Sequence, residues 1–114
     1  MADEAKVLHQ VETMLKEHDK CLVLRVTSVT GWADVIACIN GVFVAIECKD
    51  DSTSSYSLTK AQRIRLGKVL DCNGCACVVD KNNVNYFKRD VIDNLCSAQR
   101  LWKDGFSHIY GWTR

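Results

Sequence analysis

The sequence predicts one α/β domain in which helices flank a β-sheet. Short β-rich runs alternate with segments of helical periodicity in the order α-β-β-β-α-β-α. Two of the β-rich runs, 35–39 and 42–46, are joined by Asn40-Gly41. This dipeptide favours a tight hairpin, because a type I′ turn needs φ > 0 at both central residues. The 114 residues are enough for a single compact domain with a modest core.

Composition and charge narrow the class of protein further. Apolar residues make up 47% of the chain and charged residues 25%, as in ordinary globular proteins. The formal net charge of +1 gives no strong overall field, so any contact with nucleic acid must depend on local patches or on metal. No apolar run reaches about 18 residues and no signal-peptide pattern opens the chain. We therefore expect an intracellular protein without a membrane partner.

The first helix is expected over residues 2–18. Its apolar face follows the i, i+3, i+4, i+7 pattern and comprises Val7, Leu8, Val11, Met14 and Leu15. Glu4 lies about 30° from the centre of this face at 100° per residue, whereas Glu12 and Glu17 lie well over 90° away. Glu4 is thus the carboxylate of this helix that we expect to face the core. Alternatively, it is an acid in a frayed first turn that favours the helix dipole.

The first strand is expected over 21–27, followed by the hairpin. Arg25 lies within this first strand, on a face that should be partly open, since Arg is almost never fully buried without a partner. The second hairpin strand is continuously apolar, which indicates burial on both faces and a central position in the sheet.

Charged residues gather at one end of the predicted hairpin. The register set by a two-residue turn places Asp34 opposite Glu47 on one face, and Lys49, two residues on, points the same way. Opposed like charges are destabilising, so a cation between them would resolve the conflict, and carboxylate oxygens suit Mg²⁺ or Mn²⁺. Alternatively, these are charges at strand ends that reach solvent, with Lys49 paired to either acid.

The segment that follows Lys49 is polar and then basic. Residues 50–57 read as a loop, and a helix is expected over 59–71, where Thr59 and Gln62 match an S/T-x-x-Q capping box. Four cations precede any acid in this helix: Lys60, Arg63, Arg65 and Lys68. They favour a side that faces an anion such as phosphate, although helix surfaces are often simply charged.

The remainder of the chain is expected to form a strand over 75–80, a helix over 84–95 and an aromatic end segment over 96–114. For 84–95, a short strand that leads into a helix is the alternative. The end segment carries Trp102, Phe106, Tyr110 and Trp112. Aromatic residues dominate cores and interfaces, so we expect this segment to pack on the body of the domain or on a dimer partner. Stacking on bases is the alternative.

Seven cysteines without a secretory signal fit a reducing compartment. The run Cys72-Asn73-Gly74-Cys75 raises the question of zinc, but no second C-x-x-C or histidine pair follows at ligand spacing. We favour the interpretation that Asn73-Gly74 ends a helix and that Cys75 begins a strand.

Taken together, four motifs resemble those of a known family. Glu4, the G-x-x-D of 31–34, the E-C-K of 47–49 and the L-T-x-x-Q of 58–62 are similar, in this order, to the VRR-NUC family of the PD-(D/E)XK nuclease superfamily. The resemblance covers residues 4–95, and we take residues 1–95 as the nuclease domain. One departure is Ala33, where the family usually has proline. The resemblance implies a restriction-endonuclease-like core with a central mixed β-sheet. Small stand-alone members are associated with phages and are related to Holliday junction resolvases.

The resemblance also implies roles for individual residues. Asp34 and Glu47 would hold Mg²⁺ or Mn²⁺ together with the backbone carbonyl of Cys48 and, directly or through water, Glu4. The metal would activate water and stabilise charge on the attacked phosphate. Lys49 would position that water or offset charge in the transition state, and Gln62 would orient a water or a phosphate oxygen.

The implied reaction is hydrolysis of DNA phosphodiester bonds, with four-way junctions as the expected substrate by family analogy. Symmetric cleavage of a junction needs two active sites, which favours a homodimer. The expected location is the cytoplasm, that of the host cell if the gene belongs to a phage. Two alternatives stay open: a flap or nicking nuclease of replication or repair, and a DNA-binding module that has lost catalysis.

Overall fold

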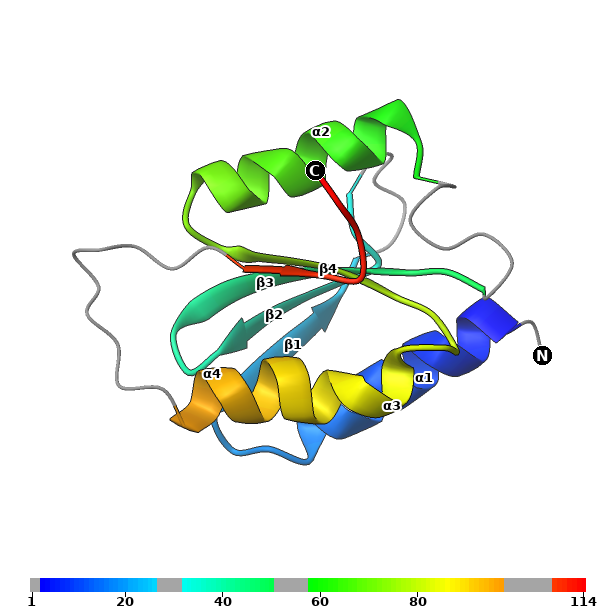
Figure 1. Ribbon diagram of the computed structural model, residues 1–114. Coiled ribbons are helices and arrows are strands. Elements are labelled where there is room, and N and C mark those ends of the chain that lie inside the picture. The colour runs from blue at the N-terminus through cyan, green and yellow to red at the C-terminus, as the bar shows by residue number, and fades with distance from the viewer. Residues whose placement is uncertain (1–2, 27–31, 51–57, 98–107) are drawn as a thin grey trace.

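A five-stranded mixed sheet between helices forms the centre of the molecule, as the computed structural model shows for residues 3–26, 32–50, 58–97 and 108–114 (Figure 1). The elements in chain order are α1 (Asp3–Lys16), β1 (Cys21–Arg25), β2 (Val35–Ile39), β3 (Val42–Cys48), α2 (Lys60–Asp71), β4 (Cys75–Val79), α3 (Val84–Phe87), η2 (Lys88–Asp93), α4 (Asn94–Ser97) and β5 (His108–Tyr110). The predicted α/β class and the order α-β-β-β-α-β-α are confirmed.

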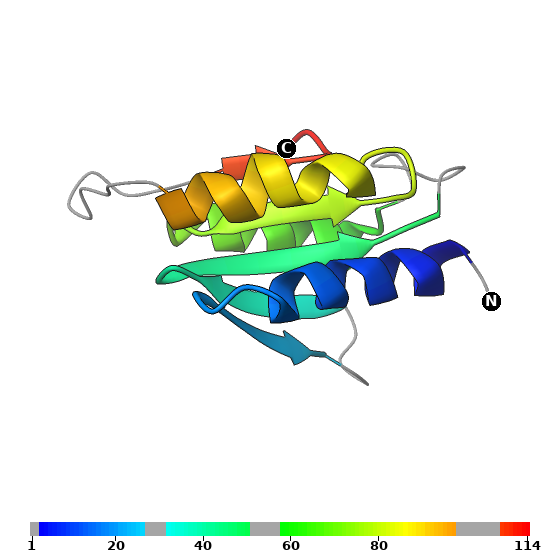
Figure 2. The ribbon, with the colours of Figure 1, turned by 90° about the horizontal axis from the view of Figure 1, so that it is seen from below.

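The strands follow one another across the sheet in the order β1-β2-β3-β4-β5. The pairs β1–β2 and β2–β3 are antiparallel, whereas the pairs β3–β4 and β4–β5 are parallel. Helix α2 lies on one face of the sheet, and α1 lies beside the run α3–η2–α4 on the other (Figures 1 and 2). No helix among the described ranges is long and apolar enough to cross a membrane.

The hairpin prediction is confirmed in turn and register. Asn40 and Gly41 have φ of 49° and 86°, as a type I′ turn requires. Ile39 pairs with Val42 at the turn, and Val35 pairs with Ile46 at the far end. Strand β3 is buried along nearly all of its length because β2 and β4 flank it and helices lie on both faces.

Two differences from the predicted elements lie in the second half of the chain. The helix expected over 84–95 is present, but its middle, η2, is π-helical and the helix extends to Ser97. The end segment contributes a strand that was not predicted. This strand, β5, has three residues and pairs in register with Cys75–Cys77 of β4. Trp102 and Phe106 lie outside the described residues.

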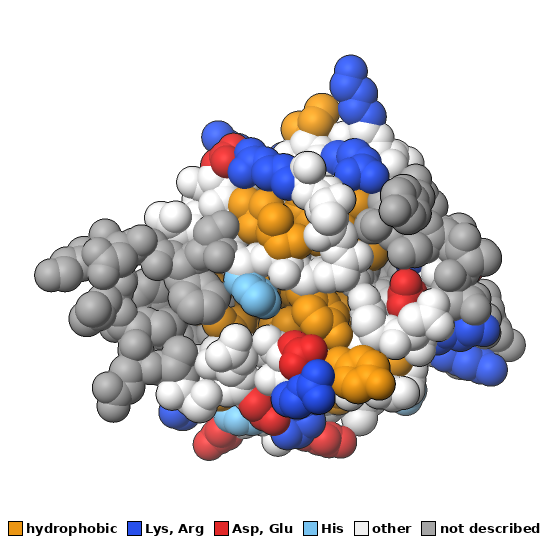
Figure 3. All heavy atoms as spheres, in the orientation of Figure 1, with side chains coloured by type: hydrophobic (Ala, Val, Ile, Leu, Met, Phe, Trp, Pro, Cys, Tyr) orange, Lys and Arg blue, Asp and Glu red, His pale blue; other side chains and the backbone are white. Residues whose placement is uncertain are grey.

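The core has two parts, one on each face of the sheet. The larger part lies between the sheet and the helices α1 and α3–η2–α4, with Val11, Leu15, Val44 and Phe87 fully buried. The smaller part lies beneath α2 and includes Leu66, Val78 and Trp112. Figure 3 shows hydrophobic side chains gathered below the lysines and arginines at the top of the molecule, where α2 lies over the sheet.

Helix α2 packs on β3 and β4, and the outer strands stay open on that side. Leu22 is 75% exposed and Leu24 is 65% exposed, both on the edge strand β1. Phe43 of β3 is 44% exposed on the same face. The molecule therefore has an uncovered apolar area on β1 and at the start of β3.

Candidate active site

Four of the predicted site residues lie where the start of β2, the end of β3 and the start of α2 meet at one end of the sheet, and Figure 1 shows these three element ends together. Asp34 precedes β2 directly, Glu47 is the last residue but one of β3, and Lys49 follows β3. Gln62 lies in the first turn of α2. Extending the observed hairpin register by one residue places Asp34 opposite Glu47, as the sequence predicts.

A chain of polar contacts joins the side chains that face α2. The Gln62 amide donates from Nε2 to Glu47 Oε1 at 3.0 Å, and Lys49 Nζ donates to Gln62 Oε1 at 3.3 Å. The Lys49 ammonium also lies 3.7 Å from Glu47 Oε1. Glu47 is thus held by an amide and an ammonium at once, although it is only 3% exposed.

The capping box of α2 fixes Gln62 itself. The Thr59 N–H donates to Gln62 Oε1 at 2.9 Å, and the Gln62 N–H donates to Thr59 Oγ1 at 3.1 Å. This reciprocal pair satisfies free donors at the start of the helix, which explains why a helix begins here. The Gln62 amide oxygen therefore accepts from the Thr59 N–H and from Lys49, and the amide nitrogen donates to Glu47.

Asp34 is anchored by the strand opposite. Its Oδ2 accepts the N–H of Cys48 at 2.7 Å. The Cys48 thiol is buried in the core on the α1 side of the sheet, so the part of Cys48 that borders the site is its backbone. The carboxylate of Asp34 is thereby held beside Glu47.

The two carboxyl groups affect one another. Burial raises the pKa of Glu47 to about 8, and the charge of Asp34 together with a hydrogen bond to it adds to this rise, while Lys49 opposes it. A buried acid beside a second acid favours the protonated form, because ionising both would place two negative charges in a poorly solvated site. Such a pair is a point where a cation would be stabilised.

Glu4 stands at the outer edge of this group. It is exposed at the start of α1. Its pKa is raised by partial burial and then by the charge of Asp34, and Lys49 opposes this rise. Glu4 therefore lies within electrostatic reach of the Asp34–Glu47 pair.

The predictions for the acids of α1 were wrong in two respects. Glu4, expected to face the core, is exposed. Glu12, placed away from the core by helical periodicity, has a side chain that is only 12% exposed. Arg25 on β1 donates from Nε to Glu12 Oε1 at 3.0 Å and covers this acid. Periodicity within one helix cannot show this, because the partner comes from a strand 13 residues further along the chain.

The donor set fits a hard divalent cation, since carboxylate oxygens are the ligands that Mg²⁺ and Mn²⁺ prefer. Asp34 and Glu47 form the close pair. Glu4 is too far from this pair for the ligand atoms of all three acids to lie within 4.8 Å of one another. Among the described residues, the three side chains that meet this distance are His18, Cys21 and Cys96. A direct bond from Glu4 to an ion held by the pair is therefore not built into this arrangement.

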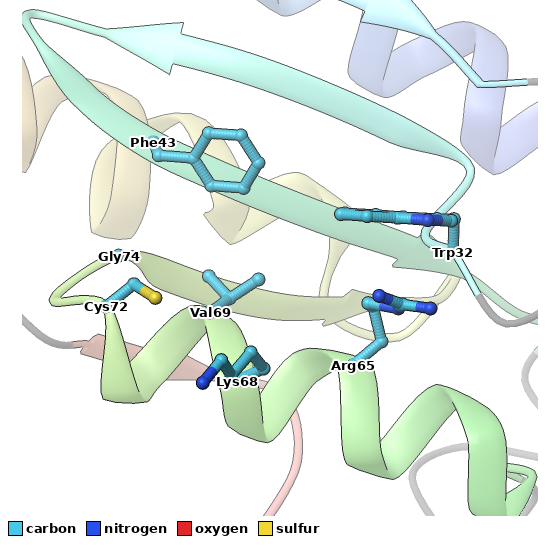
Figure 4. Close-up of a pocket in the computed structure, with 7 residues that line it drawn as sticks. All are labelled: Trp32, Phe43, Arg65, Lys68, Val69, Cys72 and Gly74. Carbon is cyan, nitrogen blue, oxygen red and sulfur yellow. The ribbon is translucent and has the colours of Figure 1, made fainter.

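A groove of about 250 Å³ opens beside the site, between α2 and the exposed face of the sheet (Figure 4). It is lined by Trp32, Phe43, Arg65, Lys68, Val69, Cys72 and Gly74. The Arg65 guanidinium lies over the Trp32 ring, 4.4 Å from its centre. Trp32 precedes Asp34 by two residues and Arg65 follows Gln62 by one helical turn, so the groove adjoins the carboxylate pair.

Two of the four α2 cations named from the sequence line this groove, and its two aromatic residues, Trp32 and Phe43, were not predicted. Arg65 and Lys68 line the groove, whereas Arg63 donates to the carbonyl of Thr113 at 3.3 Å. Trp32 was not singled out, although an aromatic residue inside the G-x-x-D motif was a readable signal.

The run at 72–75 matches the interpretation that a helix ends and a strand begins there. Helix α2 ends at Cys72, Asn73 has φ of 64°, and β4 begins at Cys75.

Comparison of the chain with protein-family models, with curated proteins and with solved structures finds no match.

Proposed function

We propose that this protein is a metal-dependent endonuclease that hydrolyses phosphodiester bonds in DNA. The observation that carries the proposal is the joining of Asp34, Glu47, Lys49 and Gln62 into one group at the end of β3. A buried carboxylate with a raised pKa, Glu47, beside a second carboxylate and an ammonium, is typical of a functional site more than of a structural ion pair. The order of these residues in the sequence is also the order that resembles the VRR-NUC family.

Each side chain has a distinct task in this proposal. Asp34 and Glu47 would hold Mg²⁺ or Mn²⁺, with the backbone of Cys48 beside them and Glu4 acting through water. Such an ion lowers the pKa of bound water and stabilises negative charge on phosphate. Lys49, 3.7 Å from Glu47, would offset negative charge on the attacked phosphate. Gln62 is a positioning residue, because it holds Glu47 and Lys49 in one orientation.

The groove beside the site supports a nucleic-acid substrate. Two cations and two aromatic rings line it, and none of its lining residues in the described part of the chain is an acid. Aromatic rings bind unpaired bases by stacking, worth about 1–3 kcal/mol per base, and cations attract phosphate. Its volume of about 250 Å³ is below the roughly 300–1,000 Å³ usual for small-molecule pockets. A single unpaired base next to the cleaved bond suits this space.

Flaps carry unpaired bases, and bases at the branch point of a four-way junction lack a continuous stack, so we propose a four-way junction, or a flap, over an intact duplex. Cleaving a junction on two strands needs two active sites, so we propose a homodimer. The open apolar area with Leu22 and Leu24 supports an association of this kind. All seven cysteines are free, which fits the cytoplasm as the place of action.

Cleavage of a panel of substrates tests this function. Labelled four-way junction, flap, single-stranded and duplex DNA are incubated with the purified chain in Mg²⁺, in Mn²⁺ and in EDTA. We expect cleavage of the branched substrates with either metal and none in EDTA. Cleavage of flaps alone would support the flap nuclease, and binding without cleavage in any metal would support the inactive DNA-binding module.

Paired aromatic substitutions test the groove. Trp32→Ala should weaken binding of branched DNA and raise KM more than it lowers kcat. Tyr86→Ala is the matched control, because Tyr86 is also an exposed ring beneath an arginine, Arg89, but lies on the opposite side of the sheet. Equal, small effects of the two changes would remove the groove from the DNA-binding surface.

A further inference from the structure

A second group of chemically reactive side chains lies at the other end of the molecule. His18 follows α1, Cys21 begins β1, and Cys96 belongs to α4. One ligand atom from each lies within 4.8 Å of the other two. The 14 residues of α1, about 21 Å of helix, separate this group from the carboxylate pair.

The distance between two of the ligand atoms matches the distance expected on zinc. Bond lengths of about 2.3 Å to sulfur and 2.0–2.1 Å to nitrogen at tetrahedral angles place a cysteine sulfur and a histidine nitrogen about 3.6 Å apart on zinc. Cys96 Sγ and His18 Nδ1 are 3.6 Å apart. Thiolate and imidazole ligands suit Zn²⁺, whereas Mg²⁺ prefers oxygen.

Contacts that involve no metal hold the three residues in place. The N–H of Cys21 donates to the carbonyl of His18 at 3.2 Å, which closes the turn that carries both. Asn40 at the hairpin tip donates from Nδ2 to the carbonyls of Leu95 and Cys96, at 3.0 and 3.4 Å. The positions of the ligands are therefore set before an ion binds, which lowers the ordering needed on binding.

One existing contact competes with metal binding at the histidine. His18 Nδ1 accepts the N–H of Lys20 at 3.1 Å. This bond is exposed, so water can replace it at the Lys20 N–H when Nδ1 binds an ion. A net hydrogen bond in an exposed position is much weaker than a zinc–ligand bond, so the metal wins this competition.

The group is reachable from solvent and leaves a position free. An open groove of about 400 Å³ is lined by His18, Lys20, Asp93, Cys96 and Ser97. The Asp19 carboxylate, 95% exposed, lies 3.5 Å from His18 Nδ1. A water from this groove or the Asp19 carboxylate can supply a fourth ligand.

We propose that His18, Cys21 and Cys96 bind one Zn²⁺ ion, which fastens the end of α4 to the turn between α1 and β1. Each thiol loses its proton to solvent as its sulfur binds, and no oxidation takes place. The site is separate from the proposed nuclease centre in place and in ligand chemistry. Its existence does not depend on whether the protein cleaves DNA.

Cobalt titration of the full-length, reduced protein tests this proposal. Co²⁺ bound by thiolates gives a sulfur-to-metal charge-transfer absorption that carboxylate sites cannot give. We expect the charge-transfer absorption to saturate at one equivalent of Co²⁺ and to disappear when one equivalent of Zn²⁺ displaces the cobalt. Cys96→Ser should weaken the affinity at least about tenfold and reduce the charge-transfer band, since even outer-shell changes at metal sites cost about 10- to 100-fold.

Cys72→Ser is the matched control, because Cys72 is an exposed thiol that lies on neither α4 nor the α1–β1 turn. It should titrate as the wild type does, and a loss of cobalt binding in this variant would place the metal at residues 72–77 and overturn the proposal. A wild-type chain without a charge-transfer band would also overturn it. Mass spectrometry of the protein as isolated gives a third outcome. A Cys21–Cys96 disulfide whose reduction restores no metal binding would also overturn the proposal.

Discussion

At the scale of single residues, the central feature is a carboxylate kept out of water. Glu47 is 3% exposed and lies beside Asp34, so the folded chain without metal holds its proton up to a pH of about 8. An unfolded chain would release this proton near 4.5, the ordinary pKa. Between about pH 4.5 and pH 8 the folded chain binds this proton and the unfolded chain does not, so the stability of the protein depends on pH there.

The sign of this dependence is a prediction. Because the folded-state pKa is the higher one, the stabilisation is complete below about pH 4.5 and is lost as pH rises towards 8. In EDTA, Glu47→Gln should therefore raise the free energy of unfolding relative to wild type by more at pH 8 than at pH 5. Urea unfolding at both values measures this. Glu17→Gln, in the exposed turn that follows α1, is the control, and a Glu47→Gln effect equal at both pH values contradicts the assignment.

Glu4 supports a second prediction at this scale. Its pKa responds to Asp34 and Lys49, so it shares the field of the site. Glu4→Gln should reduce turnover or the affinity for Mn²⁺ much more than Glu17→Gln does. Glu12 is unsuitable as the control, since Arg25 is bonded to it. If the two changes have equal, small effects, Glu4 has no role in the site and only stabilises the start of α1 through the helix dipole.

Much of the site could be predicted at the residue scale because it depends on local geometry. A two-residue turn and the alternation of side chains along strands place Asp34, Glu47 and Lys49 on one face. The contacts of Glu12 with Arg25 and of Trp32 with Arg65 could not be predicted, since each joins two elements whose relative position is decided by packing.

At the scale of elements, the end segment completes the sheet and the core beneath α2. Strand β5 extends β4, and Trp112 is buried with its Nε1 donating to the carbonyl of Ala76 at 2.9 Å. Gly111, at φ of 80°, leads the chain from β5 to Trp112, in a conformation that suits glycine. A strand of three residues is too short for a periodic pattern, which is why the sequence indicates aromatic packing here but no strand.

Trp112→Ala should accordingly destabilise the fold by about 3–5 kcal/mol, the usual cost of removing a large buried aromatic side chain. Ile109→Ala, on the same segment but 38% exposed, is the control and should cost much less. Thermal or urea unfolding compares the two. Similar losses for both changes would contradict the role of Trp112 in the core.

At the scale of the whole molecule, the two ends have different chemistry. Oxygen ligands and cations gather where α1 and α2 begin, and sulfur and imidazole gather where α1 and α4 end. Between them, the side of the sheet that carries α2 is covered over β3 and β4 and open over β1 (Figures 1 and 2). An exposed edge strand with large apolar side chains invites association.

We expect a homodimer in solution that uses this open area. Leu24→Glu should leave the stability of the single chain nearly unchanged, because Leu24 is 65% exposed, and should yield a monomer. Light scattering at micromolar concentration decides the matter, with Ile64→Glu on the exposed side of α2 as the control. A monomeric wild type, or a dimer that Leu24→Glu does not affect, contradicts this interface.

The central claim is that Asp34, Glu47 and Lys49 form a metal-dependent nuclease centre. The most direct measurement is single-turnover cleavage of the preferred branched DNA by wild type, Glu47→Ala, Lys49→Ala and the control Glu17→Ala, in Mn²⁺ and in EDTA, alongside DNA binding by each variant. We predict that wild type and Glu17→Ala cleave with Mn²⁺ alone, and that Glu47→Ala and Lys49→Ala bind DNA but lose cleavage by several orders of magnitude. Undiminished cleavage by Glu47→Ala would contradict the claim.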